Sequence, residues 1–124
     1  MLVDGEGSQE YNTIPLSGLV LAEAFLVVAT DADNGSPDGV ALVDTVSGVL
    51  LDALSYEGSI EQALIGNATY SLVEGTALPA AVADSDTKAG SLARIPNGND
   101  TDDAAADWVF TTFATSGNPN VAAG

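Results

Sequence analysis

The chain has 124 residues, of which 18 are Asp or Glu and two are Lys or Arg, so its formal net charge at pH 7 is -16. Binding to DNA, RNA or an anionic membrane surface depends on Lys and Arg side chains, so this composition excludes those partners. The lack of cysteine and histidine excludes disulfides, thiol chemistry, Cys/His zinc sites and Ser-His-Asp triads.

The apolar content is sufficient for one hydrophobic core. Hydrophobic residues make up 46% of the chain and its mean hydropathy is +0.23. The longest apolar stretch, Leu19–Ala29, is interrupted by Glu23 and is too short to cross a membrane. We therefore expect residues 1–124 to form a single domain without membrane insertion. Acid-rich, lysine-poor surfaces remain soluble at high ionic strength, which favours a marine or halophilic exported protein.

Strand patterns dominate the first half of the chain. Glu10–Gly18 is the weakest of them, since Pro15 restricts a strand to a sheet edge or a strand end. Phe25–Thr30 is rich in valine and bounded by polar residues, so it predicts a strand. Gly39–Tyr56 predicts a β-hairpin, with Gly48 in its short connection where a positive φ is wanted.

The second half mixes weaker patterns with two further strands. Ser59–Gly66 has a capping residue at its start and a glycine at its end, which predicts one or two helical turns. Thr76–Gly90 is rich in alanine and turn residues and predicts a loop, with a short helical turn as the alternative. Ser91–Pro96 and Asp107–Phe113 predict strands. Short strands, dense turns and little helix together indicate an all-β fold of the β-sandwich type.

The predicted core combines the apolar positions of these strands. Aromatic and aliphatic side chains on half-buried strands are more often core than an exposed carbohydrate platform, which is the alternative for Tyr56, Trp108 and Phe110. The core residues expected from the sequence are Phe25, Val27, Val40, Leu42, Leu50, Leu54, Tyr56, Leu92, Trp108 and Phe110.

Six segments, taken in order, follow the pattern of a known family. They are YNTIPLSG, LAEAFLVVAT, DGVALVD, LLDALSY, SLARIPNGNDTDDAAADW and TSGNPN. They extend from Tyr11 to Asn120 and resemble the lamin tail domain, an immunoglobulin-like β-sandwich. The most specific parts are the DGVALVD and LLDALSY hairpin and the block SLARIPNGNDTDDAAADW.

The resemblance carries expectations about function and edges. The family occurs in nuclear lamins and in bacterial exported proteins, beside nucleases, phosphatases and other hydrolases. It implies a non-catalytic structural or binding module of an exported or cell-surface protein, whose partner is an unidentified protein or surface polysaccharide. The family's opening strands are missing before Tyr11, so the sandwich is expected to be N-terminally incomplete. A second copy, giving a homodimer, or a folded-back N-terminal segment would then satisfy the open sheet edge.

One of the two cations, Arg94, precedes an acidic loop. A planar guanidinium holds carboxylates through two parallel hydrogen bonds, so we expect Arg94 to fix this loop. Its first expected partner is Asp107, with Asp100 or Asp102 second. Asp107, Arg94 and Trp108 are accordingly structural residues. Asp100 or Thr101 is expected to cap a helical turn at DDAAA.

Two aspartate-rich loops could supply the oxygen ligands that calcium requires. Their expected ligands are Asp31, Asp33, Asp38, Asp100 and Asp102. Neither loop has EF-hand spacing, and aspartates also cap their own turns through local hydrogen bonds. The alternative function is therefore a calcium-dependent adhesion or carbohydrate-binding module; otherwise no cofactor is expected.

No pattern supports an enzyme. Ser85–Lys88 fits a four-letter nucleophile motif but lacks its companion motifs. A pair of carboxylates can hydrolyse glycosides, but 18 acids will satisfy any required spacing somewhere.

Overall fold

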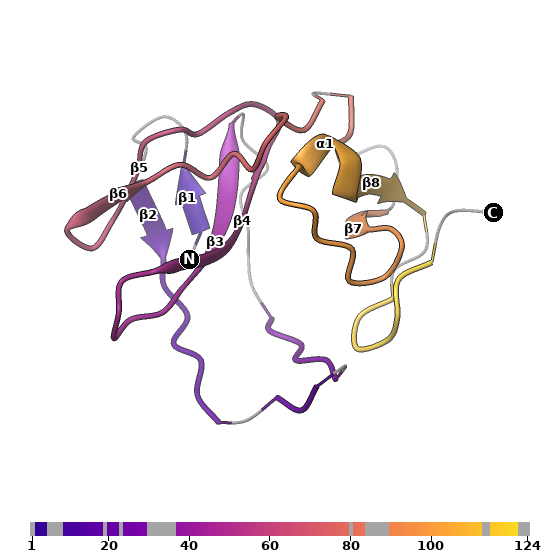
Figure 1. Ribbon diagram of the computed structural model, residues 1–124, viewed down its shortest axis with the longest axis horizontal. Helices are drawn as coiled ribbons and strands as arrows, with labels where there is room; N and C mark the ends of the chain where they lie inside the picture. The colour runs from indigo at the N-terminus through magenta and orange to yellow at the C-terminus, as the bar shows by residue number, and fades with distance from the viewer. Residues whose placement is uncertain are drawn as a thin grey trace.

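The computed structural model describes residues 2–4, 9–18, 20–22, 24–29, 37–79, 81–83, 90–112 and 115–121. Within them the fold is all-β with one helical turn (Figure 1). In chain order the elements are β1 (Leu2–Asp4), β2 (Gln9–Asn12), β3 (Asp38–Val43), β4 (Leu50–Tyr56), β5 (Ala63–Ile65), β6 (Ala68–Tyr70), β7 (Ser91–Arg94), α1 (Ala104–Asp107) and β8 (Trp108–Thr111).

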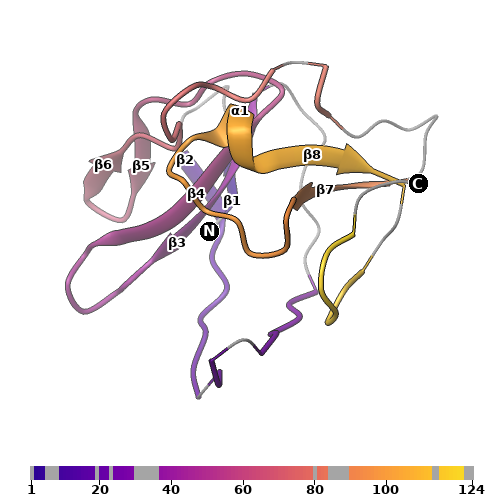
Figure 2. The ribbon, with the colours of Figure 1, turned by 45° about the vertical axis from the view of Figure 1, so that its right-hand side comes forward.

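The strands form two sheets. The larger has six strands in the order β4-β3-β1-β2-β5-β6, and β7 and β8 form the smaller. All neighbours are antiparallel except β2 and β5, which meet in parallel at Gln9 and Leu64. Figures 1 and 2 place β7, β8 and α1 together beside the β3–β4 hairpin. No helix in the described parts of the chain is long and apolar enough to cross a membrane.

The predicted hairpin is confirmed. β3 and β4 pair from Asp38 opposite Tyr56 to Val43 opposite Leu50. In the connection, the Asp44 carboxylate accepts hydrogen bonds from the backbone N–H groups of Val46 and Ser47. Gly48 has the positive φ, +74°, that its place in the turn favours.

The predicted helical turns at Ser59–Gly66 are wrong. This region instead contributes β5, which forms a hairpin with β6 through Gly66 and Asn67. Gly66 has a φ of +63°, as the first central residue of a type II′ turn requires. Ala63 and Ile65 are buried while Leu64 is exposed, so the two-residue period of a strand decides the local structure.

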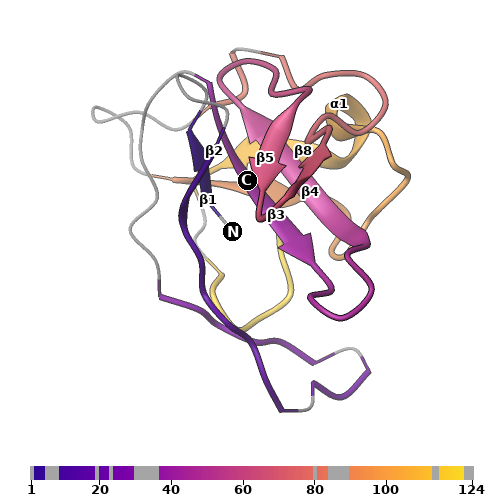
Figure 3. The same cartoon turned by 90° about the vertical axis from the view of Figure 1, so that its left-hand side faces the viewer.

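The predicted strand at Phe25–Thr30 is also wrong over its described part. Residues 25–29 form no strand, and Thr30 lies outside the described residues. Figures 1 and 3 show the chain after β2 running away from the six-stranded sheet. A strand needs a neighbour to bind its backbone groups, and valine content alone does not supply one.

The remaining predicted strands are confirmed in part. Ser91–Pro96 contains β7, and Asp107–Phe113 contains β8, although Asp107 ends α1 and Phe113 lies outside the described residues. Of Glu10–Gly18, only the first three residues belong to a strand.

The core lies on both sides of the β3–β4 hairpin. Alternate residues of β4 face opposite ways, so Ala53 joins one cluster and Leu54 the other. The first cluster contains Ala41, Ala53, Ile60, Ala63, Ile65 and Leu72. The second contains Leu54, Tyr56, Leu78 and Ala104, with Val82, Leu92 and Trp108 packed against it.

The outcome for the predicted core is mixed. Leu54 and Tyr56 are buried, and Leu50, Leu92, Trp108 and Phe110 are partly buried. The other four are exposed, and their prediction was wrong: Phe25 (45%), Val27 (61%), Val40 (40%) and Leu42 (45%). Small residues such as Ala41 and Ala53 occupy central places that the sequence pattern assigned to larger ones.

The N-terminal segment folds back onto the sheet. β1 pairs with β3, from Leu2 opposite Val40 to Asp4 opposite Asp38. This pairing covers one edge of the hairpin, whereas β4 stands at the end of the sheet order, and no described strand pairs with its outer edge.

Candidate functional site

The side chain of Arg94 connects the two sheets. It extends from the end of β7 to Asp52 in the middle of β4, where Nη1 lies 2.6 Å from Oδ2 and Nη2 lies 2.7 Å from Oδ1. These two parallel bonds are the geometry that a guanidinium and a carboxylate form at their strongest. Asp52 Oδ1 also accepts the backbone N–H of Ala53 at 2.9 Å, so this carboxylate is held from two sides.

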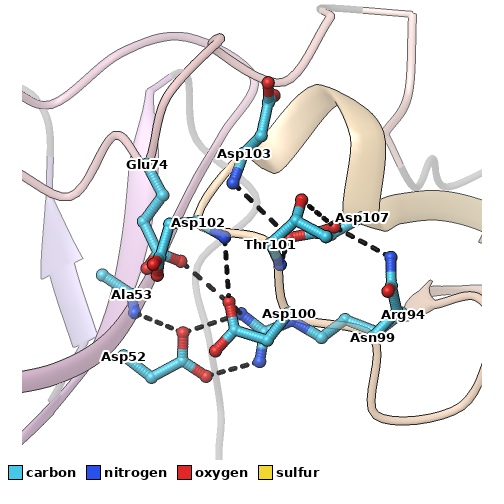
Figure 4. A network of polar contacts seen from close by, with 10 residues as sticks. All are labelled: Asp52, Ala53, Glu74, Arg94, Asn99, Asp100, Thr101, Asp102, Asp103 and Asp107. Carbon is cyan, nitrogen blue, oxygen red and sulfur yellow. Dashed lines mark hydrogen bonds and ion pairs between the residues drawn. The ribbon is translucent and has the colours of Figure 1, made fainter.

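Two further carboxylates complete the group around Arg94. Nη2 lies 3.5 Å from Oε1 of Glu74 and 3.6 Å from Oδ1 of Asp100. Figure 4 shows these acids converging from separate segments of the chain. We refer to Asp52, Glu74, Arg94 and Asp100 as the Arg94 cluster.

The predicted partners of Arg94 require correction. Asp107, the first choice, is not its ion-pair partner; the second-choice Asp100 lies close, and Asp102 does not belong to the cluster. The sequence analysis missed Asp52 and Glu74. Asp52 carried a usable signal, because it is an acid within the otherwise apolar strand LLDALSY. Glu74 carried none.

Backbone contacts with α1 hold Glu74 in place. The N–H of Ala104 donates to the carbonyl oxygen of Glu74 at 2.7 Å, and that of Ala105 donates to Thr76 at 3.0 Å. These bonds satisfy N–H groups that the first turn of a helix leaves unpaired. Gly75, with a φ of +59°, allows the close approach, because a Cβ there would lie 2.6 Å from the carbonyl oxygen of Asp102.

Asp107 organises the acidic loop from within. Its buried carboxylate accepts hydrogen bonds from Asn99 Nδ2 at 2.9 Å, from Thr101 N at 2.8 Å and from Thr101 Oγ1 at 2.7 Å. The predicted helical turn is present, but the expected cap is wrong. The N-cap is Asp103, which makes no side-chain capping bond, and Asp107 at the other end of α1 binds the loop instead.

Trp108 is the cross-strand neighbour of Arg94. The two residues pair directly between β7 and β8, and the guanidinium carbon lies 4.9 Å from the centre of the indole ring. This distance is within the range of a cation–π contact. Arg94 therefore binds carboxylates with its nitrogen atoms while its plane contacts an aromatic ring.

The cluster shifts the pKa values of its members in opposite directions. Burial raises the pKa of Glu74 to about 7, and the nearby charges of Asp52 and Asp100 act the same way. Burial also disfavours the charged form of Asp52, but hydrogen bonds and attraction from Arg94 outweigh it and lower the pKa. The hydrogen bonds that Arg94 donates to Asp52 raise the pKa of Arg94. One cation thus stabilises one carboxylate fully, and Glu74 takes up a proton near neutral pH.

The described acids that were predicted to bind metal, Asp38, Asp100 and Asp102, do not form a group of their own. Within the described residues, one group of three acids has oxygen atoms within 4.8 Å of one another, namely Asp52, Glu74 and Asp100. Only Asp100 belongs to the predicted set. Asp38 is buried at the start of β3, Asp102 lies outside the group, and Asp31 and Asp33 lie outside the described residues.

An apolar cleft of about 450 Å³ opens next to the cluster. Its walls come from the β3–β4 hairpin on one side and from β7 and β8 on the other. Gly90 lies against Phe110 here, since a Cβ would come within 2.3 Å of its ring. The lining residues that the hairpin and the two opposing strands contribute are Val40, Leu42, Leu54, Tyr56, Leu92 and Trp108, with Asp52 at the boundary with the cluster.

Comparisons with known proteins add no name to this geometry, because no family model, no curated protein and no solved structure matches the chain.

Replacing Arg94 with methionine leaves three carboxylates together without their cation. We expect the free energy of unfolding to fall by about 1.5–3 kcal/mol, the usual range for hydrogen bonds to charged groups. Urea denaturation in saline buffer measures the change. The matched control is Lys88→Met, which makes the same change to the net charge. Equal losses in the two variants would mean that only overall charge matters and that the bidentate pair contributes nothing specific.

Glu74 gives the protein a distinct pH dependence. Its pKa of about 7 in the folded state lies above its ordinary value of 4.5, so the folded state binds more protons between these values. Its contribution to stability is complete below pH 4.5 and is lost as the pH rises through 7. We expect the midpoint of thermal unfolding to fall between pH 5 and 8.

The Glu74→Gln variant, which keeps the uncharged form, should show a much flatter profile over the same range. Measurement in about 1 M NaCl reduces repulsion among the other acids. A wild-type profile as flat as that of the variant would show that Glu74 does not titrate in this window.

Proposed function

We propose that the chain is a non-catalytic binding module of an exported or cell-surface protein, built as an immunoglobulin-like β-sandwich of the lamin-tail type. Three features support this proposal: the all-β fold, the resemblance of its segments to that family, and an acidic surface suited to a salty medium. A partner role beside a hydrolase or a surface scaffold belongs to the same proposal.

The observation that carries the proposal is the apolar cleft. Val40 and Leu42 lie on a central strand, where a sheet normally buries large side chains, yet both remain exposed. Aliphatic walls, two aromatic residues and a single carboxylate are typical of a site that binds by hydrophobic contact.

The carboxylates nearby support binding rather than catalysis. Among the described residues, Asp52 is the one acid that lines the cleft, and Arg94 already pairs with it. Asp107 is buried and its oxygen atoms accept hydrogen bonds from the loop. Glycoside hydrolysis needs two carboxyl groups facing each other across a cleft, and the residues that line this one supply a single carboxylate.

Trp108 is the chain's single tryptophan and lines the cleft, so it reports occupancy directly. The uncharged dye N-phenyl-1-naphthylamine suits this protein, because the negative surface would repel an anionic dye. We expect saturable energy transfer from Trp108 to the dye. Leu42→Asn should weaken it several-fold by placing an amide in the apolar wall, whereas Leu51→Asn, at an exposed leucine of β4 that does not line the cleft, should not.

No energy transfer, or equal transfer in both variants, would contradict a binding role for the cleft. Circular dichroism of each variant establishes that its fold is retained.

A calcium-dependent adhesion module is the second candidate, favoured by the spacing of Asp52, Glu74 and Asp100. Calcium binds 6–8 oxygen atoms, and to reach these it would have to displace Arg94 from between them. This candidate expects millimolar CaCl₂ to raise the unfolding midpoint by roughly 10 °C over EDTA, for a hundredfold excess above Kd. Glu74→Gln should abolish the rise. An equal rise in NaCl at matched ionic strength would mean screening of acidic charge alone.

A further inference from the structure

We propose that the apolar cleft is filled by residues 25–28 of a second copy of the chain, so that two copies bind each other reciprocally. This inference rests on the proposed function of the cleft as a binding site and adds the identity of its occupant.

Residues 25–28 have the properties of an unused interaction segment. Phe25, Leu26, Val27 and Val28 are consecutive apolar residues, and all four are exposed. The segment forms no strand, although its composition favours one, and it lies in the part of the chain that runs away from the six-stranded sheet (Figures 1 and 2). Such a run exposed to water is rare in a monomer and marks a surface that binds another protein.

The segment lies next to the cleft, because a second hollow that it helps to line shares two residues with the cleft. Leu92 and Trp108 line the cleft and also line a second hollow of about 590 Å³, to which Ala24 and Phe25 contribute. Val27 lies beside Gly117, since its Cγ2 would lie 3.5 Å from a Cβ there. A donor segment that adjoins an acceptor cleft suits two-fold pairing, in which each copy gives and receives the same contact.

Charge explains why a second copy is a suitable occupant. Residues 24–29 contain no charged side chain, and Asp52, which lines the cleft, is paired with Arg94. Contact through these surfaces therefore buries no unpaired charge, even though each copy carries a net charge of -16. A basic partner would be drawn to the acidic surface elsewhere, because the described residues that line the cleft offer it no carboxylate other than the paired Asp52.

The area available is sufficient for a weak specific dimer. In a reciprocal dimer the exposed parts of the four segment residues, together with Val40 and Leu42, bury on the order of 1,000 Å² in total, about the lower limit for specific interfaces. Remaining repulsion between two acidic surfaces is long-range and is screened by salt. The dimer should therefore become stronger as the salt concentration rises, whereas binding to a basic partner would become weaker.

Sedimentation velocity of the full chain over a range of protein concentrations tests the proposal. We expect a monomer–dimer equilibrium in about 1 M NaCl, with a dissociation constant on the order of 100 µM, that shifts toward monomer in about 0.05 M NaCl. Val27→Asn should weaken dimerisation roughly tenfold or more. Val46→Asn, at the exposed tip of the β3–β4 hairpin, should leave it unchanged. A monomer at every concentration in high salt, or equal weakening by both variants, would overturn the proposal.

The dye experiment separates failure of this inference from failure of the proposed function. If both the binding role of the cleft and the dimer are correct, the fraction of clefts that bind dye in high salt should fall as the protein concentration rises, because partner segments occupy the cleft. Energy transfer from Trp108 measures this fraction, and Val27→Asn should abolish the fall. Dye binding that is independent of protein concentration would overturn the dimer and leave the cleft as a binding site. A dimer that shows no dye binding at low protein concentration would instead contradict the proposal that the cleft is a binding site.

Discussion

The ion pair between Arg94 and Asp52 joins two sheets that no strand pairing joins in the described part of the chain. β7 and β8 bond to each other, and β4 ends the six-stranded sheet, so the guanidinium is a polar link between them. The surrounding carboxylates compete for this one cation. One guanidinium stands among three carboxylates, and the energetically consistent arrangement gives Asp52 the bidentate contact while Glu74 keeps a proton near neutral pH. The pKa values of Asp52 and Glu74 thus depend on burial, hydrogen bonding and neighbouring charge together.

The ion pair between Arg94 and Asp52 also affects the apolar cleft, because residues that contact it line the cleft. Trp108 stacks on Arg94 and forms part of the cleft wall, while Asp52 forms the boundary between cleft and cluster. The loop after β7 is held by Asp107, whose buried carboxylate accepts hydrogen bonds from the backbone N–H and the hydroxyl of Thr101. The N-cap Asp103 makes no side-chain capping bond, and the carbonyl oxygens of Glu74 and Thr76 bind the first N–H groups of α1 instead. Glu74 is held beside the cluster because its own carbonyl oxygen and that of Thr76 accept hydrogen bonds from α1. Polar contacts thus fix the position of the aromatic wall, and the apolar surface beside it is left open.

Local sequence pattern predicted the elements whose partners are close in the chain. The β3–β4 hairpin follows from two valine- and leucine-rich runs and a glycine between them, and β7, β8 and the turn at α1 follow from similar local signals. The pattern failed where a distant partner decides the outcome. The described part of FLVVAT, residues 25–29, has strand composition but pairs with no described strand, and ALI became the strand β5 because β2 and β6 flank it. At the site, Arg94 was identifiable as one of two cations, but Asp52 lies 42 positions away and its proximity depends on how the two sheets meet.

The scarcity of positive charge also determines which positions of the sequence can accept substitutions. Acids on the outer surface can exchange places with one another or with neutral polar residues, because screening by salt makes their individual positions unimportant. Position 94 has no such freedom, since the chain contains one other cation and a lysine cannot reproduce two parallel bonds to a carboxylate. Descendants of this sequence should therefore diverge quickly over most of the surface while positions 52, 94 and 108 change together or not at all. Similarity between such relatives would survive as a few co-varying positions within a background that overall identity does not detect.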